Sequence, residues 1–446
     1  MKKIIIVAAA VCFVVRLVAQ ETVYPAPPNK GVTYIKNANI HTGTGKTITN
    51  GVIKISNGKI EQVGTASEVS IPADASVVDA KGKEVYPGLI LSSSNLGLIE
   101  VSAVRASTDS REIGELNPNV RSIVAYNTDS KVINTLRSNG ILMANIIPEG
   151  SLLAGSSSVV QLDAWTWDDA AYKTDEGIHL YMPSLLPRPA GAGRGGGGGG
   201  GGRNNPAAAD RDPVKEGLEK IEGIKSFFRE AKAYLAAPAH DETNLKFESV
   251  KGLFGKTQKL YLHANTVKQL LVALDFVKEF NFDVVIVGGS DSWQVADLLK
   301  QHNISVILQQ PHSLPTLDDD DVDQPYKTAA LLQKAGVLFT ITDDDGQTRG
   351  RNLAFNAGTA VAYGLTKEEA LAAITLNAAK ILGVSDKAGS IEVGKDANII
   401  ISDGDILDMR TSNVTDAFIQ GRKIDLNDKQ KLLNERYKEK YKLKGF

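Results

Sequence analysis

The chain has 446 residues, of which 42% are hydrophobic and 23% are charged, a composition typical of a globular protein. A chain of this length can bury a large core without disulfides or a structural metal. Its formal net charge of −2 at pH 7 gives no basic footprint for nucleic acid, so we do not expect a nucleic-acid partner.

The N-terminus has the pattern of a secretory signal, which we expect to span residues 1–20. Lys2 and Lys3 precede an apolar run, 4–15, that is too short to span a membrane comfortably. An uncleaved anchor is the alternative. The one cysteine, Cys12, lies inside this run, so the mature chain would have neither disulfides nor a catalytic thiol. We therefore expect an exported, periplasmic protein with no membrane segment after cleavage.

Short strands are predicted at both ends of the mature chain. Asn57-Gly58 lies between two alternating runs, and Asn-Gly in that setting is the strongest short signal for a hairpin. Near the other end, residues 397–401 and 417–424 also predict strands, with a turn at Gly421. We expect the two ends to form one composite β-sandwich domain from residues 21–86 and 386–426.

Strands and helices alternate between these ends. The apolar run 284–287 precedes a predicted helix at 293–302, which precedes a strand at 304–308. Continuous apolar strands alternating with helices predict a parallel sheet covered by helices. Residues 87–385 leave room for eight such units, so we predict an α/β fold whose main domain is a (β/α)8 TIM barrel rather than an open sheet.

Two segments have biased composition. Gly195 to Gly202 are eight unbroken glycines, and their ordering entropy predicts a disordered insertion at 188–213. A phosphate-binding loop is the alternative, but no strand and helix bracket the glycines as that loop requires. The lysine-rich end, 427–446, predicts a helical tail.

Three further segments resemble the amidohydrolase family, most closely its imidazolonepropionase-like members. They are GKEVYPGLI at 82–90, ALAAITLNAAKILG at 370–383 and GSIEVGKDA at 389–397. The resemblance implies a (β/α)8 barrel with a composite β-sandwich, in agreement with the strand and helix pattern. It also implies metal-assisted hydrolysis of carbon–nitrogen bonds in amides or cyclic amides, in which divalent ions activate a water and a carboxylate moves the proton.

The chain departs from that family at the usual metal ligands. Ser93 and Asn95 stand where the first strand normally carries two histidines, and Gly288 stands where a later strand carries another. His263 and Asp343 are kept. The resemblance therefore implies a degenerate site in which Ser93, Asn95 and Gly288 are vacated ligand positions.

A catalytic zinc needs three protein ligands and a water, so a third group must join His263 and Asp343. Glu149 is the candidate, since it follows an apolar run that could place it at a strand end. We predict one zinc-like divalent metal held by these three residues, with Asp343 as the catalytic carboxylate. The plainer alternatives are a hydrogen-bonded histidine at the barrel rim and an aspartate paired with Arg349 or Arg351.

Two functions follow as hypotheses. The first is an exported hydrolase of carbon–nitrogen bonds with a small-molecule or short-peptide substrate. The second is a non-catalytic pseudoenzyme that keeps the barrel as a binding or partner scaffold, because fold alone does not imply function. The sequence also leaves open a homodimer or a pairing with a related subunit. His41 and His179 lack metal-like spacing, and Asp163 lies in an aromatic and acidic cluster that we expect to pack at the surface.

Overall fold

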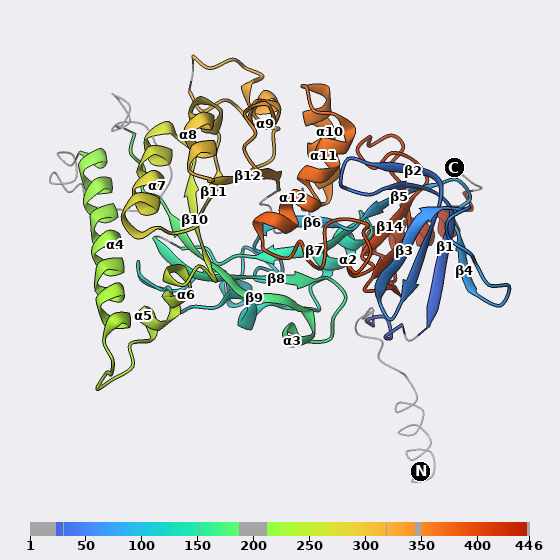
Figure 1. Ribbon diagram of the computed structural model, residues 1–446, viewed down its shortest axis with the longest axis horizontal. Coiled ribbons are helices and arrows are strands. Elements are labelled where there is room, and N and C mark those ends of the chain that lie inside the picture. The colour runs from blue at the N-terminus through green and yellow to red at the C-terminus, as the bar shows by residue number, and fades with distance from the viewer. Residues whose placement is uncertain are drawn as a thin grey trace, which may run out of the picture.

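Two eight-stranded sheets lie side by side and divide the molecule into a sheet domain and a barrel (Figure 1). The computed structural model describes residues 24–29, 31–150, 152–186, 212–317, 319–343 and 349–443. The predicted signal at 1–20 lies outside the described residues, as does the predicted glycine-rich insertion apart from Asp212 and Pro213. Within the described residues, no helix is long and apolar enough to span a membrane.

The sheet domain joins the two ends of the chain, as predicted. Its strands are β1 (Val32–His41), β2 (Thr47–Ser56), β3 (Lys59–Thr65), β4 (Ser76–Asp79), β5 (Glu84–Pro87), β14 (Ile399–Ser402), β15 (Val414–Ile419) and β16 (Arg422–Lys423). The strand order is β16-β15-β14-β5-β1-β2-β3, with β4 paired to β1. The antiparallel pairing of β14 with β5 makes the domain composite. Asn57 and Gly58 have φ of 48° and 79°, which confirms the predicted hairpin turn.

The second sheet is a nearly closed barrel whose strands neighbour one another in chain order. They are β6 (Leu89–Ser94), β7 (Ile141–Ile146), β8 (Leu153–Gln161), β9 (Ala171–Tyr181), β10 (Lys259–Ala264), β11 (Val284–Gly288), β12 (Ser305–Leu308) and β13 (Phe339–Ile341). The first and last strands meet through a side chain, because Thr342 Oγ1 lies 3.2 Å from Ser93 N and 3.3 Å from Ser93 O. The barrel predicted from the sequence is confirmed, with one departure.

That departure is the direction of β8, which runs antiparallel to both β7 and β9 while the other neighbouring pairs are parallel. Its connections explain the reversal. Only a few residues join β7 to β8, and a single-turn helix, α3 (Trp167–Ala170), lies between β8 and β9. A parallel crossover needs a dozen or more residues, so these short links can only make hairpins.

Helices cover the barrel, and several of them lie along one side of it, while the long helix α4 lies at the end far from the sheet domain (Figure 1). They are α2 (Lys131–Arg137), α4 (Pro213–Ala236), α5 (Leu245–Ser249), α6 (Lys251–Phe254), α7 (Val267–Phe280), α8 (Ala296–Gln301), α9 (Gln324–Ala335), α10 (Leu353–Ala362), α11 (Lys367–Ala373), α12 (Leu376–Ile381) and, as the predicted tail, α13 (Lys429–Tyr441). Thr266 begins α7 with a capping box completed by Gln269.

Candidate active site

A pair of histidines lies where β9 and β10 run side by side. His179 Nδ1 is 2.9 Å from His263 Nε2. The His263 ring stacks on Tyr181 at a centroid distance of 3.8 Å, and the His179 ring stacks on Tyr261 at 4.8 Å. Burial lowers the pKa of His263 to about 3 and holds the pKa of His179 well below its usual value. Both imidazoles are therefore neutral at pH 7, and one N–H donates to the lone pair of the other ring.

His179 is the site residue that the search for metal spacing missed. The sequence did carry a signal for it, since His179-Leu180-Tyr181 and Tyr261-Leu262-His263 place the same two side-chain types two residues apart. Residues two apart share one face of a strand. The parallel register sets Tyr261 opposite His179 and His263 opposite Tyr181, so both rings of each strand meet the other strand's rings.

Glu149 lies just after β7, and two side chains hold its carboxylate. Asn95 Nδ2 donates to Glu149 Oε1 at 2.6 Å, and Ser110 Oγ donates to Oε2 at 2.9 Å. Asn95 is one of the positions where the family pattern has a histidine. Its amide binds the carboxylate of the predicted extra ligand, so these two predicted site residues do meet, as a hydrogen-bonded pair.

Asp343 follows β13 and is 1% exposed. Arg349 Nε donates to its Oδ1 at 3.1 Å, and Asn356 Nδ2 donates to its Oδ2 at 3.3 Å. The ion pair with Arg349 is the plainer alternative considered from the sequence. Asp343 does not line the cavity that contains His263 and Glu149. The neighbouring Asp344 and Asp345 lie outside the described residues.

Gly288 ends β11 in a conformation that disfavours any other residue. Its φ is +103°, and a Cβ built there would lie 2.4 Å from Asn265 Oδ1. A backbone in this region costs L-residues free energy. That Gly288 is a vacated ligand position stays a prediction, and any side chain added there would meet both a strained φ and the Asn265 amide.

Restoring a histidine at this position is expected to fail. Gly288→His should lower the free energy of unfolding by about 2 kcal/mol, because it combines a strained φ with a close contact. Urea denaturation measures the loss, and elemental analysis after a zinc soak tests for a metal. Ser290→His, two residues further along the same loop, is the control for adding an imidazole without the strained φ. A fully stable Gly288→His variant that binds zinc would contradict the remodelled backbone.

One cavity brings four of the six predicted site residues together. It has an empty volume of about 700 Å³ and lies at the carboxyl ends of the barrel strands, where barrel enzymes place their chemistry. Its lining includes Ser93, Asn95, Arg111, Glu149, Tyr181 and His263. The cavity thus presents one carboxylate, one guanidinium and a neutral imidazole.

The donor set does not fit the predicted zinc-like ion. Among the described residues no group of three or more His, Cys, Asp or Glu side chains is placed to hold a metal. His263 Nε2 is engaged by His179, and both Glu149 oxygens are engaged by Asn95 and Ser110. Two such ligands fall short of the three that catalytic zinc takes from a protein. We therefore assign no catalytic step to a metal.

The chain resembles known amidohydrolases in sequence. Residues 196–424 match the model described as the amidohydrolase family. The chain is 22% identical over 381 residues to the amidohydrolase tasK of Hapsidospora irregularis, and the match covers 78% of this chain and 37% of that relative. It is 42% identical over 86 residues to an imidazolonepropionase of Thermoplasma volcanium, covering 19% of this chain and 21% of the relative. The match therefore spans only a minor part of either relative's length.

A solved structure extends the likeness over almost the whole chain. An amidohydrolase from Thermotoga maritima MSB8 superimposes with a TM-score of 0.74 at 26% identity, covering 88% of this chain and 99% of the other. A prolidase complexed with N-methylphosphonate-L-proline shares the fold at 16% identity and a TM-score of 0.53. These neighbours carry names of hydrolases.

Proposed function

The chain belongs to the amidohydrolase family. We propose that it hydrolyses carbon–nitrogen bonds in small amides, cyclic amides or short peptides. In this proposal Glu149 is the general base that activates the attacking water, the task that a metal would otherwise perform. The observation that carries this is the cavity at the barrel mouth, which sets the Glu149 carboxylate among Arg111, Tyr181 and His263. Relatives named amidohydrolase and imidazolonepropionase support the reaction class.

In the proposed reaction Glu149 takes a proton from a water, whose oxygen adds to the amide carbonyl carbon. The carbon–nitrogen bond then breaks, and the proton passes from Glu149 to the leaving nitrogen, which gives a carboxylic acid and an amine. Asn95 and Ser110 orient the carboxylate through the two hydrogen bonds described above. Arg111 lines the same cavity and supplies positive charge for the oxygen that becomes negative during attack.

The alternative hypothesis is a non-catalytic binding scaffold, and one observation is compatible with it. Each predicted catalytic or ligating group is already bound by its own chain: Glu149 by Asn95 and Ser110, His263 by His179, and Asp343 by Arg349. A barrel in this state can bind a ligand without turning it over. Hydrolysis measurements separate the two candidates.

The test is a hydrolysis assay of the purified protein on N-acyl amino acids, dipeptides and lactams, with and without dialysis against EDTA. Glu149→Gln should lower kcat roughly 100-fold, the size expected for a lost general base. Glu115→Gln, which changes an exposed glutamate paired with Lys220, is the matched control and should leave the rate unchanged. If the unmodified protein hydrolyses no compound on the panel, the result contradicts the proposed hydrolase and supports the binding scaffold. A rate lost with EDTA and restored by zinc would overturn the metal-free mechanism.

We also propose that the chain works outside the cytoplasm, in the periplasm. The basic start, Lys2 and Lys3, and the apolar run after it support export. N-terminal sequencing of the protein recovered from fractionated cells tests this. A mature chain that begins near Gln20 in the periplasmic fraction is the expected result, and an intact Met1 in the cytoplasmic fraction would contradict it.

A further inference from the structure

The C-terminal helix α13 carries an apolar stripe that lies open to solvent. Leu433, Tyr437 and Tyr441 follow one another at intervals of four residues, so they share one face of the helix. The two tyrosine rings stack on each other and are 53% and 59% exposed. All 13 residues of α13 are at least partly exposed, and a helix of this length is only marginally stable in water by itself. A second surface that covers the stripe would therefore stabilise the helix.

Basic side chains accompany this stripe. α13 has five basic residues and two acidic ones, which are Lys429, Lys431, Arg436, Lys438 and Lys440 against Glu435 and Glu439. Lys440 Nζ lies 5.0 Å from the centroid of the Tyr441 ring, and Lys438 pairs with Glu435 within the helix. A surface that complements α13 must therefore be both apolar and acidic.

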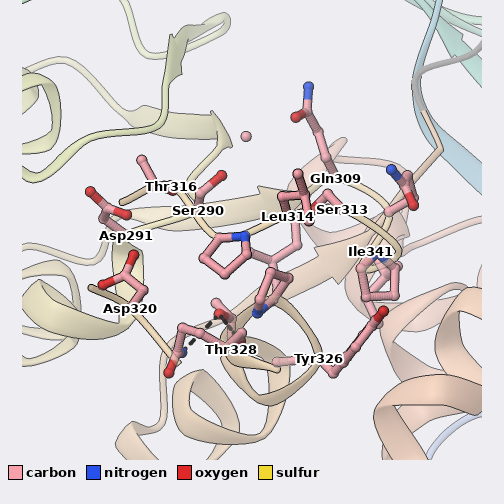
Figure 2. A pocket seen from close by; sticks show the side chains of 18 of the residues that line it. Ser290, Asp291, Gln309, Ser313, Leu314, Thr316, Asp320, Tyr326, Thr328 and Ile341 are labelled. Atoms are coloured by element: carbon pink, nitrogen blue, oxygen red, sulfur yellow. Dashed lines mark hydrogen bonds between the residues drawn. The ribbon is translucent and has the colours of Figure 1, made fainter. Parts of the chain in front are cut away.

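The loop between β12 and α9, at 309–323, has this composition. Leu314 is 86% exposed and Val322 is 79% exposed, and Leu317 is also exposed. The described part of the loop carries four aspartates: Asp319, Asp320, Asp321 and Asp323. Lys327 on α9 pairs with two of them, which leaves the region net acidic. Figure 2 shows Leu314 and Asp320 at the cavity that this loop borders, so the surface is hollowed as well as apolar.

Neither surface covers the other within one copy, because both stay exposed. α13 begins instead beside α2, where Ser138 Oγ donates to Asp428 Oδ2 at 2.6 Å. A contact between two copies would cover both apolar surfaces and set the basic residues of one copy against the aspartates of the other. An anionic lipid surface would cover the helix alone and would repel the loop. The charge pattern therefore favours a second copy of this chain.

We propose that two copies of this chain form a two-fold dimer in which α13 of each copy packs on the β12–α9 loop of the other. Tyr437 and Tyr441 lie against Leu314 and the cavity beside it, and the lysines of α13 face the loop aspartates. A two-fold axis makes both contacts at once and leaves neither surface open. The dimer goes beyond the proposed hydrolysis and does not depend on it.

Sedimentation velocity of the full chain tests for this dimer, at about 50 mM and about 500 mM sodium chloride. The unmodified protein should sediment as a dimer in low salt, and the dissociation constant should rise in high salt because the opposite charges are screened. Tyr437→Ser should raise the dissociation constant roughly tenfold or more at both salt concentrations, since it removes an aromatic anchor. Circular dichroism checks that each variant is folded.

Charge reversal gives the sharper test. Lys440→Glu sets like charges at both contacts of its own dimer, and so does Asp319→Lys, so each variant alone should be monomeric. An equimolar mixture of the two variants should dimerise again, because a mixed dimer has one contact with the charges exchanged and one with the original charges. Lys232→Glu, at an exposed position on α4, is the matched control and should dimerise as the unmodified protein does.

Three results would overturn the proposal: a monomer at every concentration, a dimer that persists in both charge-reversed variants, or a mixture of these variants that stays monomeric. A monomeric chain that binds phosphatidylglycerol vesicles through α13 would replace the second copy by a lipid surface. Both reversed positions are exposed, so the variants are expected to fold. Activity plays no part in these readouts, so failure of the hydrolysis assay leaves their interpretation intact.

Discussion

Replacing Asp163 with alanine is expected to lower the free energy of unfolding by about 3–5 kcal/mol, because it leaves two arginines without their shared counter-ion in the interior. Asp163 is 1% exposed. Its Oδ1 accepts from Arg137 Nη1, and its Oδ2 accepts from Arg422 Nη1 at 3.1 Å and from the backbone N of Ala26 at 2.9 Å. Arg137 belongs to the barrel and Arg422 to the sheet domain, so one carboxylate joins both domains to the N-terminal segment.

Urea denaturation followed by circular dichroism measures this loss. Asp416→Ala is the matched control, since Asp416 pairs with the largely exposed Lys423 and should cost less than about 1 kcal/mol. The double variant Asp163→Ala, Arg137→Met should recover part of the stability, because it removes one of the stranded charges. A loss for Asp163→Ala no larger than that of Asp416→Ala would show that the buried network contributes little.

The sequence prediction for Asp163 was wrong, and the reason is its spacing from its partners. It was placed in a surface cluster with the neighbouring tryptophans and aspartates, and Trp165 is indeed 61% exposed. The two arginines that bury Asp163 lie 26 and 259 residues away in the chain. No local pattern links residues at such separations, so charge neutralisation across a domain interface could not be inferred from one sequence.

The fold was predictable to a greater extent, because its signals are local. The apolar run 284–287, for example, predicted a strand that the structure confirms as β11, Val284–Gly288. The reversed strand β8 was not predicted, since its centre is glycine and serine at 155–158 and therefore shows neither an apolar run nor an alternating pattern. The short links on each side of β8 were the available clue.

The candidate site was also predicted only in part: its residues were found, but most of their contacts were not. The resemblance to the amidohydrolase family indicated Ser93, Asn95 and His263, and position after an apolar run indicated Glu149. These four residues line one cavity. The sequence did not predict what each of them binds, because Ser110, Asn95 and His179 lie 39, 54 and 84 residues from their partners and meet them only in the folded chain. Nor could it predict the φ of +103° at Gly288, which disfavours any side chain at that position.

His41 joins the sheet domain to the barrel, and replacing it with glutamine should destabilise the protein in a pH-dependent manner. Its Nε2 lies 2.8 Å from Glu84 Oε2, and its Nδ1 lies 2.6 Å from Glu368 Oε1 on α11. Burial alone would lower the pKa of His41, but hydrogen bonds and charge from Glu368 and Glu84 outweigh burial and raise it above the usual 6.5. Two hydrogen bonds to charged groups, partly exposed here, contribute about 3 kcal/mol.

The raised pKa fixes the sign of the pH dependence. The folded state binds the proton more tightly than the unfolded state, so the stabilisation is fully present below pH 6.5 and is lost as the pH rises through the folded-state pKa. Lys367 and Asp405 line the same small cavity as an ion pair, and the pair raises the pKa of Lys367, so that its ammonium stays charged across this window. The difference in unfolding free energy between the unmodified protein and His41→Gln should therefore be largest near pH 6 and should shrink towards pH 9. A difference that is constant or grows with pH would contradict the prediction. It would mean that the His41 ring is neutral in the folded state and donates to only one of the two carboxylates.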